Sequence, residues 1–426
     1  MEIAAVVLII VNILIAVILA IGTAPIMVWW ERRIAGFIQD RPGPNRSDIG
    51  GFRLGGLIQS FADMFKLVFK EDFTPSFIKY RFFYTIAPGI VFFASFLTFA
   101  VIPFADNLVI DGFSYQMQAI PMHLGILWFL AYAGLSVYGI ILGGYSSESK
   151  YGLLGAIRAS AQVISYEAAM GLALVSLLIT YGSVDLNTAV HIQGGLLLGF
   201  IPSWGVIMQP LACLIFVVTA FAETNRTPFD IAEGESEIVA GYHVEYSAMK
   251  FGLFQVGEYA AMCASSALIV TLFFGGYQIP WVDTATLQAH MNTILIILII
   301  LCPLGILGFT KWIKKNNVWK NPNDRRAKET KFLVKALWAT AIIMVVIFLA
   351  LLIIGLTTNG VNIMTGIIQV CVFLVKFFLM CFVFIWIRWT LLRFRYDQLQ
   401  MLGWKVLLPL ALLNIVITAV VVVLGN

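Results

Sequence analysis

The chain has 426 residues, of which 60% are hydrophobic and 12% are charged, and its formal net charge is +4. A mean hydropathy of +0.92, together with repeated apolar runs of about 20 residues, excludes a soluble globular protein. The composition predicts an all-α polytopic membrane protein, because each run is long enough to cross a bilayer as a helix.

Cysteine and histidine are not arranged as metal ligands. The five cysteines all fall inside apolar runs and no pair is spaced CxxC, so we interpret them as small core residues. The four histidines are scattered, and no glycine-rich nucleotide-binding loop occurs. We therefore expect no metal or redox centre in this chain, and any electron carrier would belong to a partner.

Ten membrane-spanning helices are predicted from the apolar runs. The run at the N-terminus has no Lys or Arg before it and no small-residue cleavage site, so we expect it to be retained as a span. The predicted spans lie at roughly 5–30, 82–102, 122–144, 155–181, 204–222, 249–274, 291–311, 332–355, 365–388 and 404–424.

The basic residues predict the orientation of these spans. Of the 27 Lys and Arg, 26 lie in the connections after spans 1, 3, 5, 7 and 9 or beside them, and Lys376 is left inside a span. By the positive-inside rule, those connections face the cytoplasm and both termini lie outside.

The first cytoplasmic connection contains a turn and an amphipathic helix. The sequence RPGPN, at 41–45, is typical of a rigid turn near the membrane face. After it, apolar residues recur at helical spacing from Leu54 to Val68, with Asp63, Lys66 and Lys70 between them. This pattern predicts a helix that lies in the membrane interface or forms a lid beside a cavity.

Three charged residues fall inside predicted spans. Glu167, Glu258 and Lys376 would each be costly at membrane depth unless they face a bundle interior or water. Such residues indicate a functional site, and a structural pair between helices is the alternative.

The stretch from Phe221 to Tyr259 is unusually acidic for this composition. It contains seven carboxylates, namely Glu223, Asp230, Glu233, Glu235, Glu237, Glu245 and Glu258. If the middle of the stretch is helical, Asp230, Glu233 and Glu237 share a face, although Gly234 weakens that prediction. At about 7 Å, each like-charge pair costs roughly 2 kcal/mol, so the cluster would retain protons at neutral pH and pass them on. The alternative is a solvated acidic loop with Arg226 as a partial counter-ion.

The cytoplasmic connection between spans 7 and 8 is strongly basic and contains two tryptophans. It would suit anionic lipid or an acidic partner, and a simple topology anchor is the alternative. We find no internal repeat, which disfavours a transporter built from inverted halves.

Five stretches together resemble one family, the quinone-site membrane subunit of respiratory complex I, the proton-translocating NADH:quinone oxidoreductase. They read WERRIAGFIQDRPGPN, GGLIQSFADMFKLVFKED, RASAQVISYE, FAETNRTPFDIAEGESEIVAGYHVEY and RWTLLRFRYDQLQMLGWK. The resemblance implies a protein without a redox centre of its own, in which a quinone chamber lies at the junction of the hydrophilic and membrane arms. It also implies partners: iron–sulfur and quinone-head subunits, and small and antiporter-like membrane subunits.

The resemblance also assigns roles to residues. The quinone entrance and chamber, for ubiquinone or menaquinone, would be formed by Glu31, Arg32, Arg41, Asp63, Lys66, Arg226 and Phe229. The proton path would comprise Glu167, Glu223, Asp230, Glu233, Glu235, Glu237, Glu258 and Lys376.

The family usually has eight spans, and residues 279–365 would add two more with the basic loop between them. We therefore divide the chain into a family core (1–278), an inserted two-span hairpin (279–365) and the last two family spans (366–426). We expect the hairpin to be peripheral.

Three other functions compete with this interpretation. They are a homologous subunit of a membrane-bound hydrogenase or other non-NADH dehydrogenase, a stand-alone proton-coupled transporter, and a structural anchor. For location, we favour a bacterial plasma membrane over a mitochondrial inner membrane.

Overall fold

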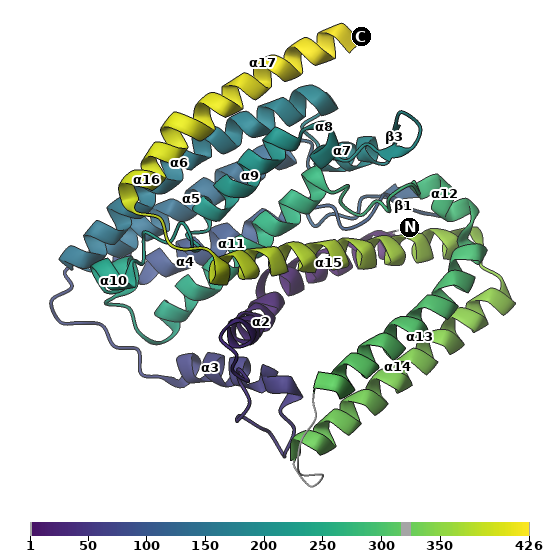
Figure 1. Cartoon of the computed structure of the whole chain (residues 1–426), viewed down its shortest axis with the longest axis horizontal. Helices are drawn as coiled ribbons and strands as arrows, with labels where there is room; N and C mark the ends of the chain where they lie inside the picture. The colour runs from purple at the N-terminus through teal and green to yellow at the C-terminus, as the bar shows by residue number, and fades with distance from the viewer. Residues whose placement is uncertain (1, 317–324, 426) are drawn as a thin grey trace.

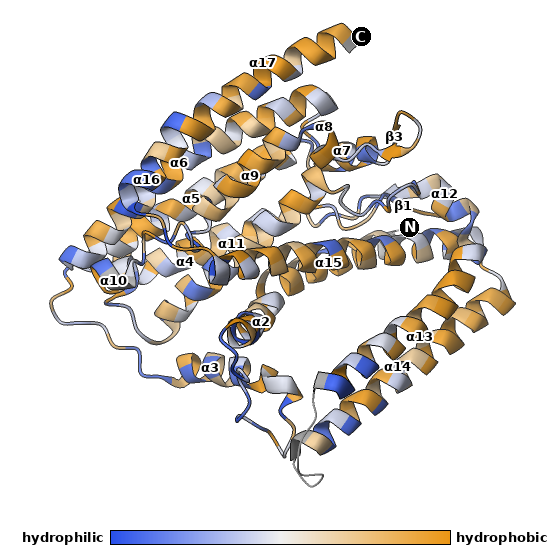
Figure 2. Ribbon diagram, viewed as in Figure 1, coloured by the Kyte–Doolittle hydropathy of each residue, from blue (hydrophilic) through white to orange (hydrophobic). Residues whose placement is uncertain are grey.

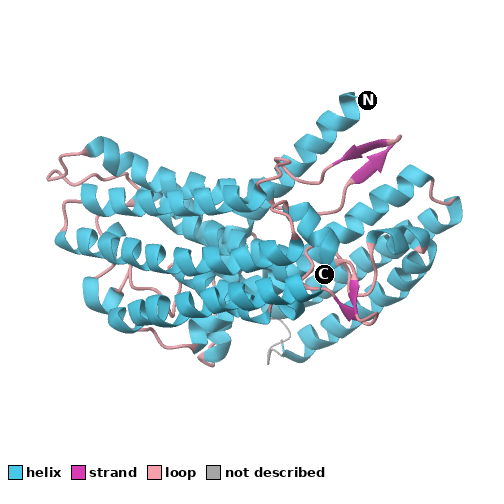
Figure 3. Cartoon of the chain, turned by 90° about the horizontal axis from the view of Figure 1, so that it is seen from above, coloured by secondary structure: helices cyan, strands magenta, loops and turns pink. Residues whose placement is uncertain are grey.

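The computed structural model describes residues 2–316 and 325–425, without the side chains of residues 2–4, 235, 236, 316, 325, 326 and 425. These residues form a bundle of long helices, with two small antiparallel sheets in the connections (Figure 1). Figure 3 shows the strands at the margin of the helical bundle. The predicted all-α polytopic fold is confirmed.

Nine helices in the described part of the chain are long and apolar enough to cross a membrane. The first of them runs from Ala5 to Ile38 through a π-helical turn, and the last combines two helices through another such turn. The helices and turns that build these nine are α1 (Glu2–Val17), η1 (Ile18–Gly22), α2 (Thr23–Ile38), α4 (Arg81–Leu97), η3 (Thr98–Val101), α5 (Gly125–Ser146), α6 (Lys150–Tyr181), α11 (Ala248–Phe273), α13 (Met291–Asn316), α14 (Arg325–Ile354), α15 (Thr358–Thr390), α16 (Tyr396–Met401), η5 (Leu402–Leu407) and α17 (Leu408–Gly425).

The predicted fifth span differs from the other nine, because it is divided into two helices. It consists of α8 (Gly205–Met208) and α9 (Pro210–Glu223), which are separated at Gln209. Pro210 occupies the first turn of α9, where its missing N–H costs nothing. A helix of 14 residues is about 21 Å long, shorter than the hydrocarbon core of a typical bilayer.

Short elements connect the long helices. They are η2 (Leu54–Gly56), α3 (Leu57–Phe69), β1 (Leu108–Ile110), β2 (Phe113–Tyr115), α7 (Leu186–Gln193), β3 (Leu196–Leu197), β4 (Ile201–Pro202), α10 (Glu235–Ile238), η4 (Gly241–His243) and α12 (Thr284–Ala289). In Figure 1, α7, α12 and both ends of the chain lie toward the right, and α10 and α16 lie toward the left. The predicted amphipathic helix after RPGPN is α3, and its aromatic residues Phe61, Phe65 and Phe69 are exposed in the isolated chain.

Helix α11 lies at the centre of the bundle and contacts α2, α3, α4, α9 and α15. Its close approach to α4 depends on small residues. A Cβ on Gly257 would lie 2.9 Å from Cγ1 of Val91 in α4, and a Cβ on Gly139 in α5 would lie 2.6 Å from the other methyl of that valine. Two glycines therefore accommodate one valine, as expected for membrane helices that associate through close packing.

Helices α13 and α14 form a hairpin at the edge of the bundle (Figure 1). Most residues along the middle of both helices are hydrophobic (Figure 2), and several of them, such as Ile300, Leu304 and Val346, are exposed in the isolated chain. A small core of Leu287, Met291, Leu295 and Met364 attaches this hairpin to α12 and to the first turns of α15. The hairpin is thus fixed to the rest of the molecule near one end of its helices.

Candidate functional site

A cavity of about 520 Å³ lies between α2, α3 and α11. Its walls are mainly apolar and include Val28, Leu67 and Val256. Polar groups interrupt them, among them an ion pair between Arg32 Nη1 and Asp63 Oδ2, at 2.6 Å, and the buried pair of Glu31 and Tyr259. This combination suits a largely apolar ligand with a polar head.

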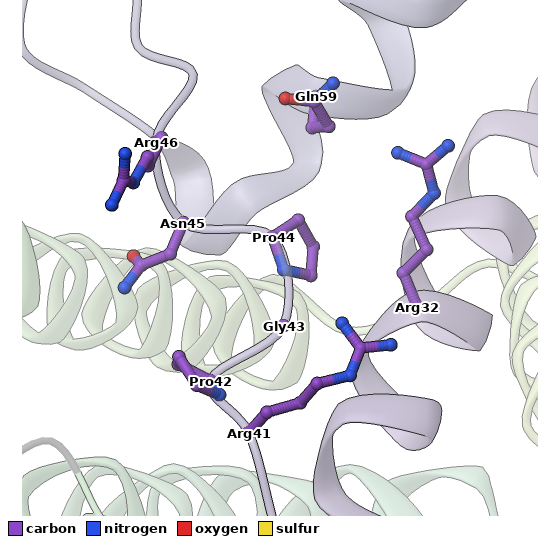
Figure 4. Close-up of a pocket in the computed structure, with 8 residues that line it drawn as sticks. All are labelled: Arg32, Arg41, Pro42, Gly43, Pro44, Asn45, Arg46 and Gln59. Atoms are coloured by element: carbon purple, nitrogen blue, oxygen red, sulfur yellow. The ribbon is translucent and has the colours of Figure 1, made fainter. Parts of the chain in front are cut away.

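The Pro-braced loop borders the cavity on one side. Arg41 lines both this cavity and a more open pocket of about 620 Å³ formed by the loop itself. Figure 4 shows Arg32 and Arg41 around Pro44, with Gln59 of α3 nearby. Gly56, at φ +96°, is required here, because a Cβ on it would clash with the Pro44 carbonyl oxygen.

Glu31 is the centre of a buried charge cluster beside the cavity. Arg226 Nη1 donates to its Oε2 at 3.2 Å, and Arg388 Nη1 lies 2.6 Å from its Oε1. Tyr259 donates its hydroxyl proton to Oε2 at 2.8 Å, and the Arg226 guanidinium lies over the Tyr259 ring, 4.1 Å from its centroid. Two cations and one carboxylate leave the cluster with a net positive charge, which favours binding of an electron-rich group.

A second cavity, of about 320 Å³, is lined by Thr227, Asp230, Glu233, Arg388, Trp389 and Arg393. Trp389 also lines the first cavity, and Arg388 pairs with Glu31 of the first cavity. The two cavities therefore share Trp389 as a wall residue, and Arg388 beside it joins their charged groups through its ion pair with Glu31.

The carboxylates of the second cavity titrate abnormally. Burial raises the pKa of Asp230 to about 6, against the lowering effect of Arg393. Burial, and then the neighbouring Glu258 and Asp230, raise the pKa of Glu233 well above its usual value. Tyr242 remains protonated because burial and the same carboxylates raise its pKa, and it donates to Glu258 Oε1 at 2.6 Å. The raised pKa values of Asp230 and Glu233 favour the protonated form of each carboxyl, and interacting carboxyl groups titrate as a pair.

Comparison with known proteins identifies the family to which the chain is similar. The sequence model of a family described as NADH dehydrogenase matches residues 10–313 and 331–419. The H subunit of the NADH-quinone oxidoreductase of Flavobacterium psychrophilum is 37% identical over 93% of this chain and 91% of its own. The H subunit of the Salinibacter ruber enzyme is 38% identical over 94% of this chain and 92% of its own. Subunit 8 of the Rhodothermus marinus enzyme is 38% identical over 94% of this chain and 93% of its own.

The chain belongs to the NADH dehydrogenase family.

The match to this family includes most of α13 and α14 and omits residues 314–330 between them. An alignment of 396 residues with the Flavobacterium relative leaves about 30 of the 426 unmatched, fewer than residues 279–365 contain. At least part of the hairpin therefore has a counterpart in this relative. The division of the chain at 278 and 365 remains a prediction.

The prediction that the middle of the acidic segment is helical is wrong. Residues 226–234 form turns, and the helix α10 begins only at Glu235, after Gly234 at φ +38°. Consequently Asp230 and Glu233 line the second cavity, whereas Glu237 turns outward and pairs with Arg158 at 2.7 Å. The side chain of Glu235 lies outside the described residues.

Glu223 and Glu167 form a separate pair of acids, on α9 and α6. They interact electrostatically, and Oε2 of Glu223 is buried without a hydrogen-bond partner. Glu167 Oε1 would lie 3.1 Å from a Cβ on Gly134, so this carboxylate fills space left by a glycine of α5. Both acids thus lie within the bundle, as the prediction for Glu167 requires.

Three residues that the family resemblance assigns to the quinone site or the proton path line neither of the two cavities. Lys66 is exposed on α3 and does not line the cavity. Phe229 is buried between the rings of Tyr166 and Phe394. Lys376 donates to three backbone carbonyls just beyond α11, those of Phe274, Gly276 and Gln278. Glu258 lies sixteen residues before Phe274 in sequence, or about 24 Å along the helix.

Sequence reasoning missed Arg388, Arg393, Tyr242 and Tyr259 as members of the site. A signal was present, because RWTLLRFRYDQLQ belongs to a stretch that resembles the family and forms an arginine-rich turn. Its first two arginines are those that contact Glu31 and Asp230. Among the described residues, no group of three or more His, Cys, Asp or Glu is arranged to hold a metal ion.

Proposed function

We propose that this chain is the membrane subunit of a proton-translocating NADH:quinone oxidoreductase that forms the quinone entrance and chamber and the start of the proton path. The names of its relatives support the enzyme complex. The observation that supports the rest is that an apolar cavity and a cavity lined by carboxylates with raised pKa values share Trp389, while Arg388 lines the second cavity and pairs with Glu31 of the first.

The cavity suits a quinone with an isoprenoid tail, ubiquinone or menaquinone. The tail would lie against apolar residues such as Val28, Leu67 and Val256. Arg32, Arg41 and Asp63 would border the entrance, and the polar head would pass them on its way into the chamber. The charged groups at the entrance would orient the head without binding the tail.

Reduction of a quinone to a quinol takes up two electrons and two protons, and the electrons would come from an iron–sulfur subunit of the hydrophilic arm. Negative charge that develops near Glu31 acts on its two arginines, and Arg388 also faces the carboxylates of the second cavity. Because the pKa values of Asp230 and Glu233 are raised, a small change in the field redistributes their protons. Glu258, Glu223 and Glu167 would extend the path into the membrane.

The partners and location follow from this role. Iron–sulfur and quinone-head subunits would cover the loop side that carries α3 and α10, and small and antiporter-like subunits would lie beside the bundle. The membrane would be a bacterial plasma membrane with both termini on the periplasmic side, in agreement with the distribution of basic residues.

Membranes carrying Glu233→Gln test the proposal, with Glu245→Gln, an acid of the same segment outside both cavities, as the control. Assembly is checked on a native gel, and inhibitor-sensitive quinone reduction and proton uptake are measured together. We expect Glu233→Gln to assemble and to lose both activities, while the control retains them. Retention of both activities in assembled Glu233→Gln would refute the proton path through this cluster.

A further inference from the structure

The hairpin has a contact with the rest of the molecule far from its attachment at α12. Near the start of α14, Oε1 of Glu329 accepts hydrogen bonds from the backbone N–H of Arg53, at 3.2 Å, and of Gly55, at 3.0 Å. Its other oxygen lies 3.4 Å from Arg53 Nε. One side chain of the hairpin therefore holds the loop that leads into α3 by three contacts.

These contacts continue into the loop at the mouth of the cavity. Arg53 Nη1 donates to both the backbone and the side-chain oxygen of Asn45, each at 3.0 Å. From α2, Arg33 donates to the carbonyl of Gly55 and, at 2.9 Å, to that of Pro42. The loop from Pro42 to Gly55 is thus fixed from α2 on one side and from the hairpin on the other.

The ion pair is well suited to this task, because it is largely removed from solvent. The side chains of Arg53 and Glu329 are only 9% and 13% exposed. Next to it, the rings of Phe52 and Phe332 meet edge to face, with centroids 5.1 Å apart. A sheltered carboxylate that accepts two backbone N–H groups orients the chain more strongly than an exposed pair does.

The loop needs such support because it has little structure of its own. Apart from a single β-bridge between Ile49 and Phe52, it forms no ladder with another strand. Its glycines at 43, 50, 51 and 55, and Gly56 directly after it, all have positive φ, and a glycine-rich segment loses the most conformational freedom on ordering. Without the contacts from Glu329, Arg53 and with it Asn45 would lose an anchor.

We infer that Glu329 is a positioning residue for the quinone entrance. It orders the loop between α2 and α3 and thereby keeps Arg41 at the mouth of the cavity, although Glu329 itself does not line that cavity. The inference rests on the proposed function, and it gives the hairpin a role in quinone access in addition to its place in the membrane.

Steady-state kinetics of the assembled complex provide the first measurement, with a short-chain quinone as the varied substrate. Glu329→Ala should raise the KM for quinone by about tenfold and leave kcat within about twofold, because positioning affects binding more than chemistry. Glu329→Gln should raise the KM for quinone by only about twofold to threefold, because the amide oxygen can still accept hydrogen bonds from both N–H groups. Lys331→Ala, an exposed neighbour on the same helix, is the control and should not change either constant.

Amide hydrogen exchange of the same complexes provides the second measurement. In Glu329→Ala, exchange at Arg53 and Gly55 should be at least about tenfold faster, because both amides lose their acceptor. Unchanged exchange would overturn the inference, and so would faster exchange with an unchanged KM. The proposed function is tested separately by a photoreactive quinone on the wild-type complex, whose failure to label the cavity walls would refute that function whatever the loop does.

Discussion

Replacing Arg393 by Gln should move the acidic limb of the pH–activity profile to higher pH. The pKa of Asp230 is about 6, with burial raising it and Arg393 lowering it. Without the guanidinium, the pKa rises further, so Asp230 becomes protonated at a higher pH. If ionised Asp230 accepts a proton in each turnover, activity is full above its pKa and is lost as the pH falls through it.

The size of the shift follows from the geometry. Arg393 Nη2 lies 3.5 Å from Asp230 Oδ2, and the two side chains are 25% and 16% exposed. At this distance, an effective dielectric near 20 gives about 5 kcal/mol as an upper bound for the Coulomb energy between the two charges. Exposed ion pairs contribute less than about 1 kcal/mol. An intermediate interaction energy of about 1.4 kcal/mol corresponds to one pH unit, which places the midpoint of the acidic limb at about pH 7 in the variant.

The assay is inhibitor-sensitive quinone reduction and proton uptake in inverted membrane vesicles, across the pH range in which carboxylates titrate. Arg393→Lys retains the charge and should keep the limb close to that of the wild type. Arg395→Gln removes a charge two residues away, from an arginine that is 74% exposed and pairs with Asp397 on the surface, and should change nothing. The reasoning is refuted if the limb does not move in Arg393→Gln, or if it moves equally in Arg395→Gln.

Three further predictions concern other parts of the molecule. Tyr242→Phe removes the hydroxyl that donates to Glu258 at 2.6 Å, a loss of about 1–3 kcal/mol for the carboxylate, and should reduce proton uptake and quinone reduction in complexes that still assemble on a native gel. Gly56→Ala should weaken assembly and raise the KM for quinone, because its Cβ would clash with the Pro44 carbonyl oxygen. Lys376→Met should lower the Tm of the complex by removing about 3 kcal/mol of charged hydrogen bonds to backbone carbonyls, and an unchanged Tm would show that these bonds contribute nothing.

Hydropathy was sufficient to predict most of the fold. Apolar runs give the positions of the long helices because every backbone polar group in a bilayer must be paired within its own segment. The exception is the predicted fifth span, where Pro210 begins a new helix and divides the run into α8 and α9. Sequence periodicity does not reveal such a break, since Gln209 and Pro210 lie within an otherwise apolar stretch.

The acidic cluster was predictable in composition but not in geometry. Helical spacing placed Glu237 beside Glu233, but positive φ at Gly234 ends that register and turns Glu237 toward Arg158. Arg388 and Arg393 could not be assigned to the site from spacing, because they reach it from more than 120 residues farther along the chain. Contacts of this kind depend on how whole helices pack, which local patterns do not encode.

The cluster around Glu31 joins four distant segments, through Arg226, Tyr259 and Arg388. Arg388 follows Glu31 by 357 residues, so the second cation for Glu31 is synthesised long after the carboxylate. A nascent chain inserts its N-terminal helices first, and until α15 arrives it carries this carboxylate with one cation instead of two. The order of synthesis therefore means that the charge cluster is complete only when α15 has joined the bundle.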